Sequence, residues 1–366
     1  MQSNNKKKIC IVASSLGKGG AEKSSATLSK MLFANGYDVH IVTVLNNIGY
    51  DFSGKLFNLG ILKDEKDSFL GRLNRLIRFK KYLNQQKFDC IIDNRSRIQA
   101  YREFIINFFV YKTPVIYVIH NYNTLNAFTR YNWLNKLMYK NKQMVAVSNE
   151  AKEKFKNKFK IKRIETIYNS LDIEDLNEQA NEKLDLSNDK YILYYGRIDD
   201  YHKNLKFIIT CFKHSSLPNN GFKLLLLGNG KDLALIKKFT EQLSLNEHVV
   251  FKTFINNPFP YVKQAYFTVL GSRFEGFPMV ILESLALGTP VVSVDCKSGP
   301  KEIVIDKING ILVENNNRAA FIEAMDEFVL NETLYSECKK NAKQSIEKFS
   351  TSNIVKNWVS LIETLD

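Results

Sequence analysis

Short apolar runs alternate along this chain with longer stretches of helical periodicity. Most of the apolar runs are continuous, which is typical of strands in a parallel sheet that helices cover on both faces. Strand–helix alternation at this spacing predicts βαβ units with right-handed crossovers. We expect strands at residues 8–13, 38–44, 89–93, 114–119 and 143–147, and again at 191–195, 222–227, 248–251, 267–270 and 290–294.

The break between the two series falls in residues 172–190, which are polar and lack apolar periodicity. We therefore predict two Rossmann-like, doubly wound α/β domains, at residues 1–172 and 191–348, joined by a linker at 173–190. Residues 349–366 contain a last helix that we expect to pack back toward the first domain. Ligands of such sheets bind beyond the carboxyl ends of the strands. Two domains of this kind facing each other would surround a cleft with loops from both.

The composition of the 366 residues narrows the class of protein. Hydrophobic residues make up 45 %, but no run approaches the roughly 20 apolar residues of a membrane span, and residues 9–13 are too short for a signal-peptide core. No His/Cys cluster has the spacing of metal ligands. Scattered cysteines without a CxxC pair favour a cytoplasmic location and no disulfide framework. They are Cys10, Cys90, Cys211, Cys296 and Cys338.

The formal net charge of +14 is concentrated in the first half. Residues 1–185 hold 31 lysines and arginines against 18 acidic residues, a net of +13, whereas the rest is nearly balanced. Such a half is expected to meet a membrane surface, a nucleic acid or a polyanionic substrate. Residues 69–81 predict a basic amphipathic helix, and residues 151–163 add further lysines. One face of this basic helix would carry Leu70, Leu73, Leu76, Ile77 and Leu83.

We interpret these two basic segments as a peripheral site for an anionic membrane. The alternative is a helix that packs its apolar face on the sheet and leaves solvated charges outside. A nucleic-acid-binding protein is a further alternative. No helix-turn-helix, RRM or zinc-finger pattern is present, so we expect no nucleic-acid partner.

Two loops of the first half are candidates for chemistry. In residues 14–22, Gly19 and Gly20 open the first helix, where backbone N–H groups favour an anion; a tight strand–helix turn is the alternative. His120 ends the strand at 114–119, at the edge where ligands bind. The alternative for His120 is a structural histidine with satisfied hydrogen bonds.

Two loops of the second half are more informative. Arg197 and Lys203 follow the strand at 191–195 and could converge on one diphosphate, unless they are solvated charges. In the loop after 267–270, Pro278 suits a helix start whose free N–H groups face a ligand, and Glu275 precedes that helix. Glu283 lies among apolar residues, so its burial would require a partner such as a ribose hydroxyl. Exposure or an internal partner is the alternative.

Together these loops resemble family four of the retaining glycosyltransferases, which have the GT-B architecture. The strongest match is Glu275-x7-Glu283 within Arg-Phe-Glu-Gly-Phe-Pro. Further matches follow in the order of the family over nearly the whole chain: Gly19-Gly20-Ala21-Glu22, Val147-Ser148, Tyr168-Asn169-Ser170-Leu171-Asp172, Gly288-Thr289-Pro290-Val291-Val292, Gly299-Pro300-Lys301-Glu302 and Asn309-Gly310-Ile311-Leu312-Val313.

The resemblance implies an enzyme that moves a hexose or N-acetylhexosamine from a nucleotide diphosphate sugar, UDP before GDP, to a glycan or lipid-linked acceptor. It implies retention of configuration, no metal or other cofactor, and a role in lipopolysaccharide, capsule or other bacterial surface polysaccharide synthesis at the inner face of the cytoplasmic membrane. The implied catalytic residues are His120, Arg197, Lys203 and Glu275. The implied donor-binding residues are Gly19, Gly20, Arg197, Lys203, Phe274, Gly276, Phe277, Pro278 and Glu283.

Within this assignment, Arg197 and Lys203 would neutralise the leaving diphosphate, and Glu283 would hold the ribose. Glu275 would contact the transferred sugar, and His120 would line the sugar pocket near the acceptor. A sugar-nucleotide epimerase or a phosphorylase is the nearest rival. An epimerase would need no acceptor, and a phosphorylase should carry a pyridoxal-phosphate lysine, which nothing in the sequence identifies.

Overall fold

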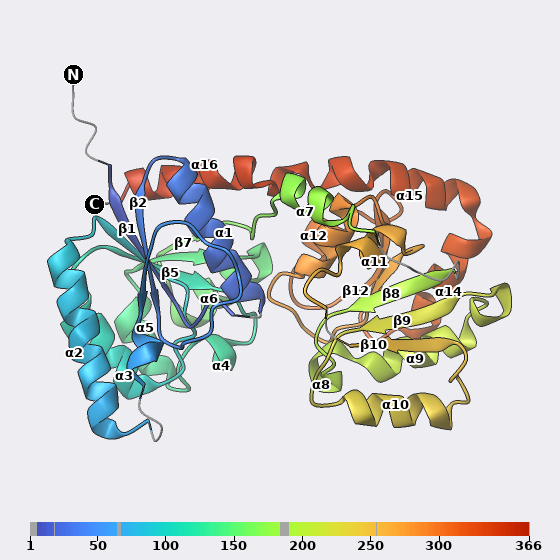
Figure 1. Cartoon of the computed structure of the whole chain (residues 1–366), viewed down its shortest axis with the longest axis horizontal. Coiled ribbons are helices and arrows are strands. Elements are labelled where there is room, and N and C mark those ends of the chain that lie inside the picture. Colours follow the sequence, from blue (N-terminus) through green and yellow to red (C-terminus); the bar gives the residue numbers. More distant parts are fainter. Residues whose placement is uncertain (1–5, 18, 64–66, 184–189, 254, 366) are drawn as a thin grey trace. The chain divides into compact units, whose positions relative to one another are not determined.

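The structure is a computed structural model that describes residues 6–365 except 18, 64–66, 184–189 and 254. The chain divides into two compact units (Figure 1). Unit 1 comprises Met1–Ser170 together with Thr351–Asp366, and unit 2 comprises Leu171–Ser350. Each unit has its own sheet and its own hydrophobic core.

Unit 1 is built on a parallel sheet of seven strands in the order β3-β2-β1-β4-β5-β6-β7. The strands are β1 (Lys8–Ala13), β2 (Asp38–Thr43), β3 (Lys55–Asn58), β4 (Cys90–Asp93), β5 (Val115–Ile119), β6 (Gln143–Ala146) and β7 (Arg163–Thr166). The helices are α1 (Gly20–Ala34), η1 (Leu59–Leu62), α2 (Phe69–Gln86), α3 (Ala100–Ile105), the π-helical η2 (Ile106–Val110), α4 (Thr124–Ala127), α5 (Asn132–Tyr139), α6 (Asn149–Phe159) and α16 (Thr351–Glu363).

Unit 2 is built on a parallel sheet of six strands in the order β10-β9-β8-β11-β12-β13. The strands are β8 (Tyr191–Tyr195), β9 (Lys223–Leu227), β10 (Val249–Lys252), β11 (Thr268–Leu270), β12 (Val291–Asp295) and β13 (Gly310–Glu314). The helices are α7 (Ile173–Gln179), α8 (Asp200–Lys203), α9 (Leu205–His214), η3 (Pro218–Asn220), α10 (Leu233–Gln242), α11 (Phe259–Gln264), α12 (Met279–Ala286), α13 (Pro300–Ile303), α14 (Arg318–Leu330), α15 (Glu332–Ser345) and η4 (Glu347–Phe349).

Both sheets therefore share the 3-2-1-4-5-6 strand order of doubly wound nucleotide-binding folds, with one extra strand in unit 1. Strands β1, β4, β5 and β8 are buried along nearly their whole length, as continuous apolar runs require. In each sheet the order reverses beside the first strand, between β1 and β4 and between β8 and β11. Loops diverge at these two points, which is where ligands of this architecture bind.

All ten predicted strands are present within one residue at each end. Three further strands, β3, β7 and β13, were not predicted. Each lies at an edge of its sheet, and β3 and β7 are mostly exposed or half-buried. An edge strand has one unpaired side and fewer apolar side chains to bury, so its sequence lacks the continuous apolar run by which the other strands were recognised.

The predicted linker at 173–190 begins with helix α7, which belongs to unit 2. Asp172 caps this helix by accepting a hydrogen bond from the Asp175 N–H at 3.1 Å, and Leu176 is buried. One buried leucine in an otherwise polar segment produces no visible periodicity, which explains why the sequence did not predict the helix. Residues 184–189 of this segment lie outside the described residues.

The last helix, α16, belongs to unit 1, where it packs on α1 (Figure 1). Its side chains Trp358 and Ile362 are buried. Near its end, Glu363 pairs with Lys7 at 2.7 Å and accepts a hydrogen bond from the Tyr37 hydroxyl at 2.8 Å. The two ends of the chain thus complete one unit.

The apolar face predicted for α2 is divided in the structure. Leu83 is buried in the core of unit 1 and Leu76 packs against that core, whereas Leu70, Leu73 and Ile77 are exposed. The helix therefore contacts the core mainly through its second half. Helix α2 thus does not lie on the sheet along its whole length, and its apolar side chains do not form a single buried stripe.

Candidate functional site

The loop after β8 begins with a close approach of two backbone segments. A Cβ on Gly228 would lie 1.9 Å from the Gly196 carbonyl oxygen, and Gly228 has a φ of +152°. Only glycine allows this contact. The contact sets the path of the chain into Arg197, whose own carbonyl accepts a hydrogen bond from the Tyr194 hydroxyl at 2.7 Å.

The Arg197 guanidinium is exposed and makes no hydrogen bond or ion pair with any described residue. It therefore carries a full, uncompensated positive charge at the carboxyl end of β8. An arginine in this condition is available to an anionic ligand, because none of its donors has to be withdrawn from another partner.

Lys203 and Glu275 form the ion pair at the centre of the site. The Lys203 ammonium lies 2.6 Å from Glu275 Oε1, and the Ser272 hydroxyl donates to the same oxygen at 2.7 Å. The two charged side chains are only 18 % and 13 % exposed. Lys203 comes from α8 after β8 and Glu275 from the loop after β11, so the pair spans the point where the strand order reverses.

Backbone hydrogen bonds to the loop after β12 fix the position of Glu275. Its N–H donates to the Lys297 carbonyl at 2.9 Å, and its carbonyl accepts from the Ser298 N–H at 3.1 Å. The Ser298 hydroxyl donates to the Gly276 carbonyl at 2.8 Å. Phe274 lies edge-on to the His202 ring, with centroids 5.0 Å apart. The carboxylate is therefore held by a rigid loop.

Glu283 is only 6 % exposed and lies on α12, which Pro278 caps. The Tyr195 hydroxyl is 3.1 Å from Glu283 Oε2 and 2.8 Å from the Val280 carbonyl. Burial, and then the nearby Glu283 charge, raise the pKa of Tyr195 well above its usual value. Glu283 thus has an internal partner, although a ligand hydroxyl could still bond its carboxylate.

Phe277 and Pro278 are buried beside Gly299. A Cβ on Gly299 would lie 2.7 Å from Pro278 Cδ, and Gly299 has a φ of +104°. The close packing of these residues determines where α12 begins. Any contribution of Phe277 and Pro278 to a ligand site would therefore come from the position that they give to the start of α12 and not from their side chains.

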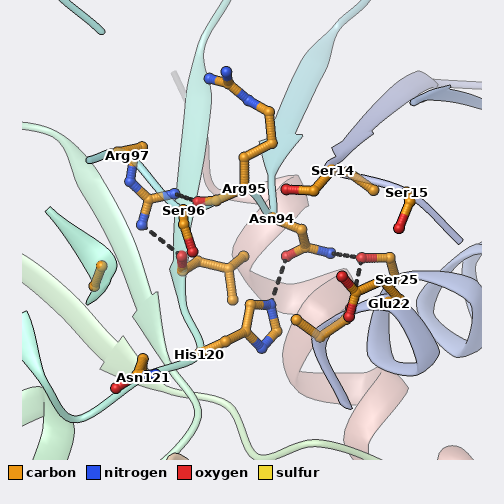
Figure 2. A pocket seen from close by; sticks show the side chains of 14 residues that line it. Ser14, Ser15, Glu22, Ser25, Asn94, Arg95, Ser96, Arg97, His120 and Asn121 are labelled. Carbon is orange, nitrogen blue, oxygen red and sulfur yellow. Dashed lines mark hydrogen bonds between the residues drawn. The ribbon is translucent and has the colours of Figure 1, made fainter. Parts of the chain in front are cut away.

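Unit 1 has a small hollow, open to solvent, at its own reversal point. The hollow is shown from close by in Figure 2. Its lining comes from the ends of β1 and β5, from the loops after β1, β4 and β5, and from helices α1 and α4. The residues are Ala13, Ser14, Ser15, Ala21, Glu22, Ser25, Asn94, Arg95, Ser96, Arg97, Val118, His120, Asn121 and Ala127.

His120 Nε2 lies 3.2 Å from Asn94 Oδ1, and the pKa of His120 is lowered to about 3 by burial and by the charge of Arg97. Gly19 and Gly20 form the start of α1, next to Ala21 and Glu22 of the hollow. A Cβ on Gly19 would lie 2.3 Å from Glu22 Oε2, whereas Gly20 is exposed with open space around it. Lys18, which precedes them, lies outside the described residues.

The predicted site residues thus form two groups. In unit 2 the structure joins Lys203 to Glu275, while Arg197 lies on the loop after β8 and Glu283 on helix α12. In unit 1, His120 lines the hollow that begins beside Gly19. The sequence did not single out Ser25, Asn94, Arg97, Tyr195 or Ser272. Asn94 and Arg97 had a signal that could have found them, since both lie in the loop that follows a buried strand.

Comparison with known proteins decides the family. A profile described as "Glycosyltransferase Family 4" matches residues 18–175, and one described as "Glycosyl transferases group 1" matches residues 177–345. A Campylobacter jejuni N-acetylgalactosamine-N,N'-diacetylbacillosaminyl-diphospho-undecaprenol 4-alpha-N-acetylgalactosaminyltransferase is 30 % identical over 96 % of this chain and 98 % of its own length. The chain belongs to the family 4 glycosyltransferases. The Erwinia amylovora amylovoran biosynthesis glycosyltransferase AmsD is 23 % identical over 94 % of the chain and 96 % of its own length.

Solved structures confirm the expected GT-B fold of this glycosyltransferase. Staphylococcus aureus TarM, as a mutant in complex with fondaparinux, alpha-GlcNAc-glycerol and UDP, has a TM-score of 0.78 at 18 % identity. The match covers 98 % of this chain and 100 % of the TarM chain. Anabaena HepE in complex with UDP-glucose has a TM-score of 0.76 at 16 % identity, with the same coverage.

Two properties of the described residues bear on membranes and metals. None of the described helices of the glycosyltransferase combines the length and the apolar character needed to cross a bilayer. No cluster of three or more His, Cys, Asp or Glu side chains suited to a metal ion occurs in the part of the chain that the structure describes.

Proposed function

We propose that this glycosyltransferase moves a hexose or N-acetylhexosamine from a UDP-sugar to a lipid-linked glycan in bacterial surface glycan synthesis, with retention and without a metal. The observation that carries the proposal is the set of Arg197, Lys203, Glu275 and Glu283 at the reversal point of unit 2. The 30 % identical relative, whose name specifies a diphospho-undecaprenol acceptor, supports the acceptor class. The UDP complexes of TarM and HepE support the carrier.

The charges of unit 2 suit a nucleotide diphosphate. Transfer breaks the bond between the anomeric carbon and a phosphate oxygen, and the electron pair stays on the diphosphate. A hydroxyl oxygen of the acceptor forms the new bond to that carbon, and its proton passes to the departing diphosphate. A fixed guanidinium and ammonium stabilise the charge that develops on the leaving diphosphate, which is the largest electrostatic demand of the reaction.

These two cations can stabilise the charge of the leaving diphosphate, which a divalent ion does in metal-dependent transferases. Arg197 has no competing partner among the described residues, and Lys203 is held in place by Glu275. Retention can proceed by a front-face substitution or through a covalent intermediate. Both routes leave the same negative charge on the diphosphate, so both need the same cations.

Glu283 is the proposed ribose ligand, and Glu275 the proposed contact of the transferred sugar. Glu283 is buried beside Tyr195, so a ribose would bond a carboxylate whose direction is already set. Glu275 is anchored by backbone hydrogen bonds on both sides. Preorganised carboxylates of this kind lose little freedom when a ligand binds.

Binding of unit 1 to an anionic membrane forms the second part of the proposal. Helix α2 exposes Phe69 by 77 %, Leu70 by 74 % and Ile77 by 57 %, next to Arg72 and Arg78. An amphipathic helix with exposed large apolar side chains and arginines is suited to the boundary between headgroups and acyl chains. The π-helical η2 exposes two further aromatic side chains of unit 1, Phe108 and Phe109.

Donor binding is tested by calorimetry with a panel of UDP- and GDP-sugars in EDTA. Arg197→Ala is expected to weaken binding of the preferred UDP-sugar about 10- to 100-fold without lowering the melting temperature, because hydrogen bonds to charged groups contribute about 1.5–3 kcal/mol. Arg163→Ala, at an exposed arginine at the start of β7, is the matched control. Unchanged affinity in Arg197→Ala, or an absolute need for manganese, would overturn the site assignment.

Transfer itself is tested with the donor that binds and with an undecaprenyl-diphosphate-linked amino sugar as acceptor. The anomeric coupling constant in the product spectrum reports retention or inversion. Release of free nucleotide with a rearranged sugar and no acceptor would instead show an epimerase.

Membrane binding is tested by co-sedimentation with vesicles of phosphatidylcholine alone or with phosphatidylglycerol. Each basic residue near an anionic surface adds roughly 1 kcal/mol, so binding should need phosphatidylglycerol and weaken with salt. Leu70→Glu with Ile77→Glu should abolish it. Leu330→Glu, at a leucine of unit 2 that is 73 % exposed, should not. Equal binding by both variants would exclude α2 as the contact.

A further inference from the structure

The hollow of unit 1 contains buried polar groups to which the proposed function gives no role. Asn94 is 6 % exposed, Ser25 is 1 % exposed and Arg97 is 1 % exposed. Asn94 and Arg97 come from the loop after β4, and Ser25 comes from α1. The three side chains lie around His120, which directly follows β5 (Figure 2).

With the Asn94 amide oriented as in the structure, the hydrogen bonds around His120 run in one direction. The Ser25 hydroxyl donates its proton to the Ala21 carbonyl at 2.9 Å, so its oxygen accepts from the Asn94 amide at 3.0 Å. The NH₂ group of Asn94 therefore faces Ser25, and its carbonyl oxygen faces His120. That oxygen can only accept, so His120 Nε2, at 3.2 Å, must carry the hydrogen.

His120 Nδ1 is then a lone-pair acceptor, and it is buried without a hydrogen-bond partner among the described residues. An unpaired polar atom in a buried position costs free energy in the empty protein. A bound group with an O–H donor would remove that cost.

The surroundings keep this ring neutral. Arg97 donates to the carbonyls of Asp93 at 3.1 Å, Arg95 at 2.7 Å and Val118 at 2.6 Å. It thus holds a fixed positive charge beside the imidazole. Burial and this charge together lower the pKa of His120 to about 3.

The other titratable groups that line the hollow are Glu22 from α1 and Arg95 from the loop after β4. The Arg95 side chain points away from His120 in Figure 2 and pairs with Asp93 and Glu103. A neutral, directed imidazole with such a low pKa is a poor general base near neutral pH, because an effective base needs a pKa near the working pH.

We propose that Asn94 and Ser25 are positioning residues that hold His120 in its Nε2–H form, so that Nδ1 accepts a hydrogen bond from a hydroxyl of a sugar bound in this hollow. The inference rests on the proposed function. The hydroxyl belongs either to the donor sugar or to the acceptor glycan, and the chemistry is the same for both. His120 on this account orients a hydroxyl and does not remove its proton.

The first test is ¹⁵N NMR of the full chain labelled at histidine, which reads the tautomer without any substrate. His120 should show the pattern of a neutral Nε2–H ring from pH 7 down to pH 5, where an ordinary histidine is charged. Ser25→Ala frees the Asn94 amide to turn, so the tautomer should become mixed. An Nδ1–H or charged ring in the native chain, or an unchanged tautomer in Ser25→Ala, would overturn the positioning role.

The second test adds one ligand at a time at saturating concentration. UDP-N-acetylgalactosamine tests the donor, and an N-acetylgalactosamine glycoside tests the acceptor. The Nδ1 resonance of His120 should move in one arm, which then identifies the source of the hydroxyl, while that of His214 should not. Demonstrated binding with no movement in either arm would refute the contact. No binding in either arm would count against the proposed donor and acceptor while the tautomer result still stands.

The third test separates positioning from mere structure through the pH profile. Asn94→Asp places a carboxylate against Nε2, which favours a charged imidazole whose Nδ1 donates. Transfer by this variant should fall below pH 7 and recover as the pH rises, whereas the native chain should show no inflection from His120. His120→Asn, which retains an acceptor oxygen, should keep KM within about threefold, and His120→Leu should raise it about tenfold. Parallel profiles for Asn94→Asp and the native chain would contradict the proposal.

Discussion

The ion pair between Lys203 and Glu275 makes a prediction that a purely structural role for the lysine does not make. In the ligand-free chain the ammonium is bonded to Glu275 Oε1 at 2.6 Å. A diphosphate that binds Lys203 must share it with this carboxylate, and the two anions also repel each other. Glu275→Gln should therefore tighten the binding of UDP while it reduces sugar transfer.

The expected magnitude follows from the contact. A hydrogen bond to a charged group contributes about 1.5–3 kcal/mol and a neutral one about 0.5–1.5 kcal/mol. The amide that replaces the carboxylate keeps the weaker bond to Lys203 and to Ser272. The difference is about 1 kcal/mol, since both charged side chains are less than one-fifth exposed and are screened only in part. One kcal/mol corresponds to roughly fivefold in Kd.

The assay is calorimetric titration of UDP in EDTA at low and at high salt, beside a transfer assay with the preferred donor. Glu275→Gln should bind UDP about fivefold tighter at low salt, with a smaller gain at high salt, and transfer should fall on the order of 100-fold. Glu241→Gln, at an exposed glutamate of α10, controls for the loss of one charge. If Glu275→Gln bound UDP no tighter, and Lys203→Met bound it equally well, Lys203 would not be a phosphate ligand.

Three further outcomes can be checked by unfolding measurements. The unfolded chain protonates His120 near pH 6.5 and the folded chain only near 3, so the unfolded state binds more protons in between. His120 should thus cost about 2 kcal/mol of stability between pH 7 and pH 5, which His120→Asn should restore in urea titrations. Tyr195→Phe removes a donor from buried Glu283 and should lower the stability by about 1–2 kcal/mol, or the melting temperature by about 2–8 °C. Gly228→Ala should prevent unit 2 from folding, as seen by circular dichroism, because its Cβ would meet a carbonyl at 1.9 Å; Gly20→Ala, in open space, should be neutral.

The architecture could be predicted because a parallel sheet needs buried strands on both faces. Strands such as β5 and β8 are apolar at every position, and this continuous pattern is typical of strands in such a sheet. The edge strands β3 and β7 were not predicted because they bury few side chains. Helix α7 was not predicted because Leu176 is its one buried residue among those described, and a single residue shows no periodicity.

Only those features of the candidate site that depend on local sequence could be predicted. Loops that follow buried strands were found, and with them Arg197, Lys203 and Glu275. The pairing of Glu283 with Tyr195 joins residues 88 positions apart, and that of His120 with Asn94 joins residues 26 positions apart. No local pattern encodes such contacts, because they depend on which strands become neighbours in the sheet.

The two units differ in the exposure and pairing of their cationic side chains, and this difference supports separate ligands for them. In unit 2, Arg197 is exposed and uncompensated by described residues, and Lys203 is paired with a carboxylate that a ligand can displace. Such cations suit a ligand that brings its own negative charge. In unit 1, Arg97 is buried and bonded to three carbonyls, and the ring beside it is neutral. The cations that line the hollow are thus already bonded, and Glu22 adds a carboxylate, which suits the hydroxyls of a sugar better than a phosphate. On this reasoning electrostatics favours the proposed assignment of diphosphate to unit 2 and of uncharged sugar groups to unit 1, independently of the family to which the chain belongs.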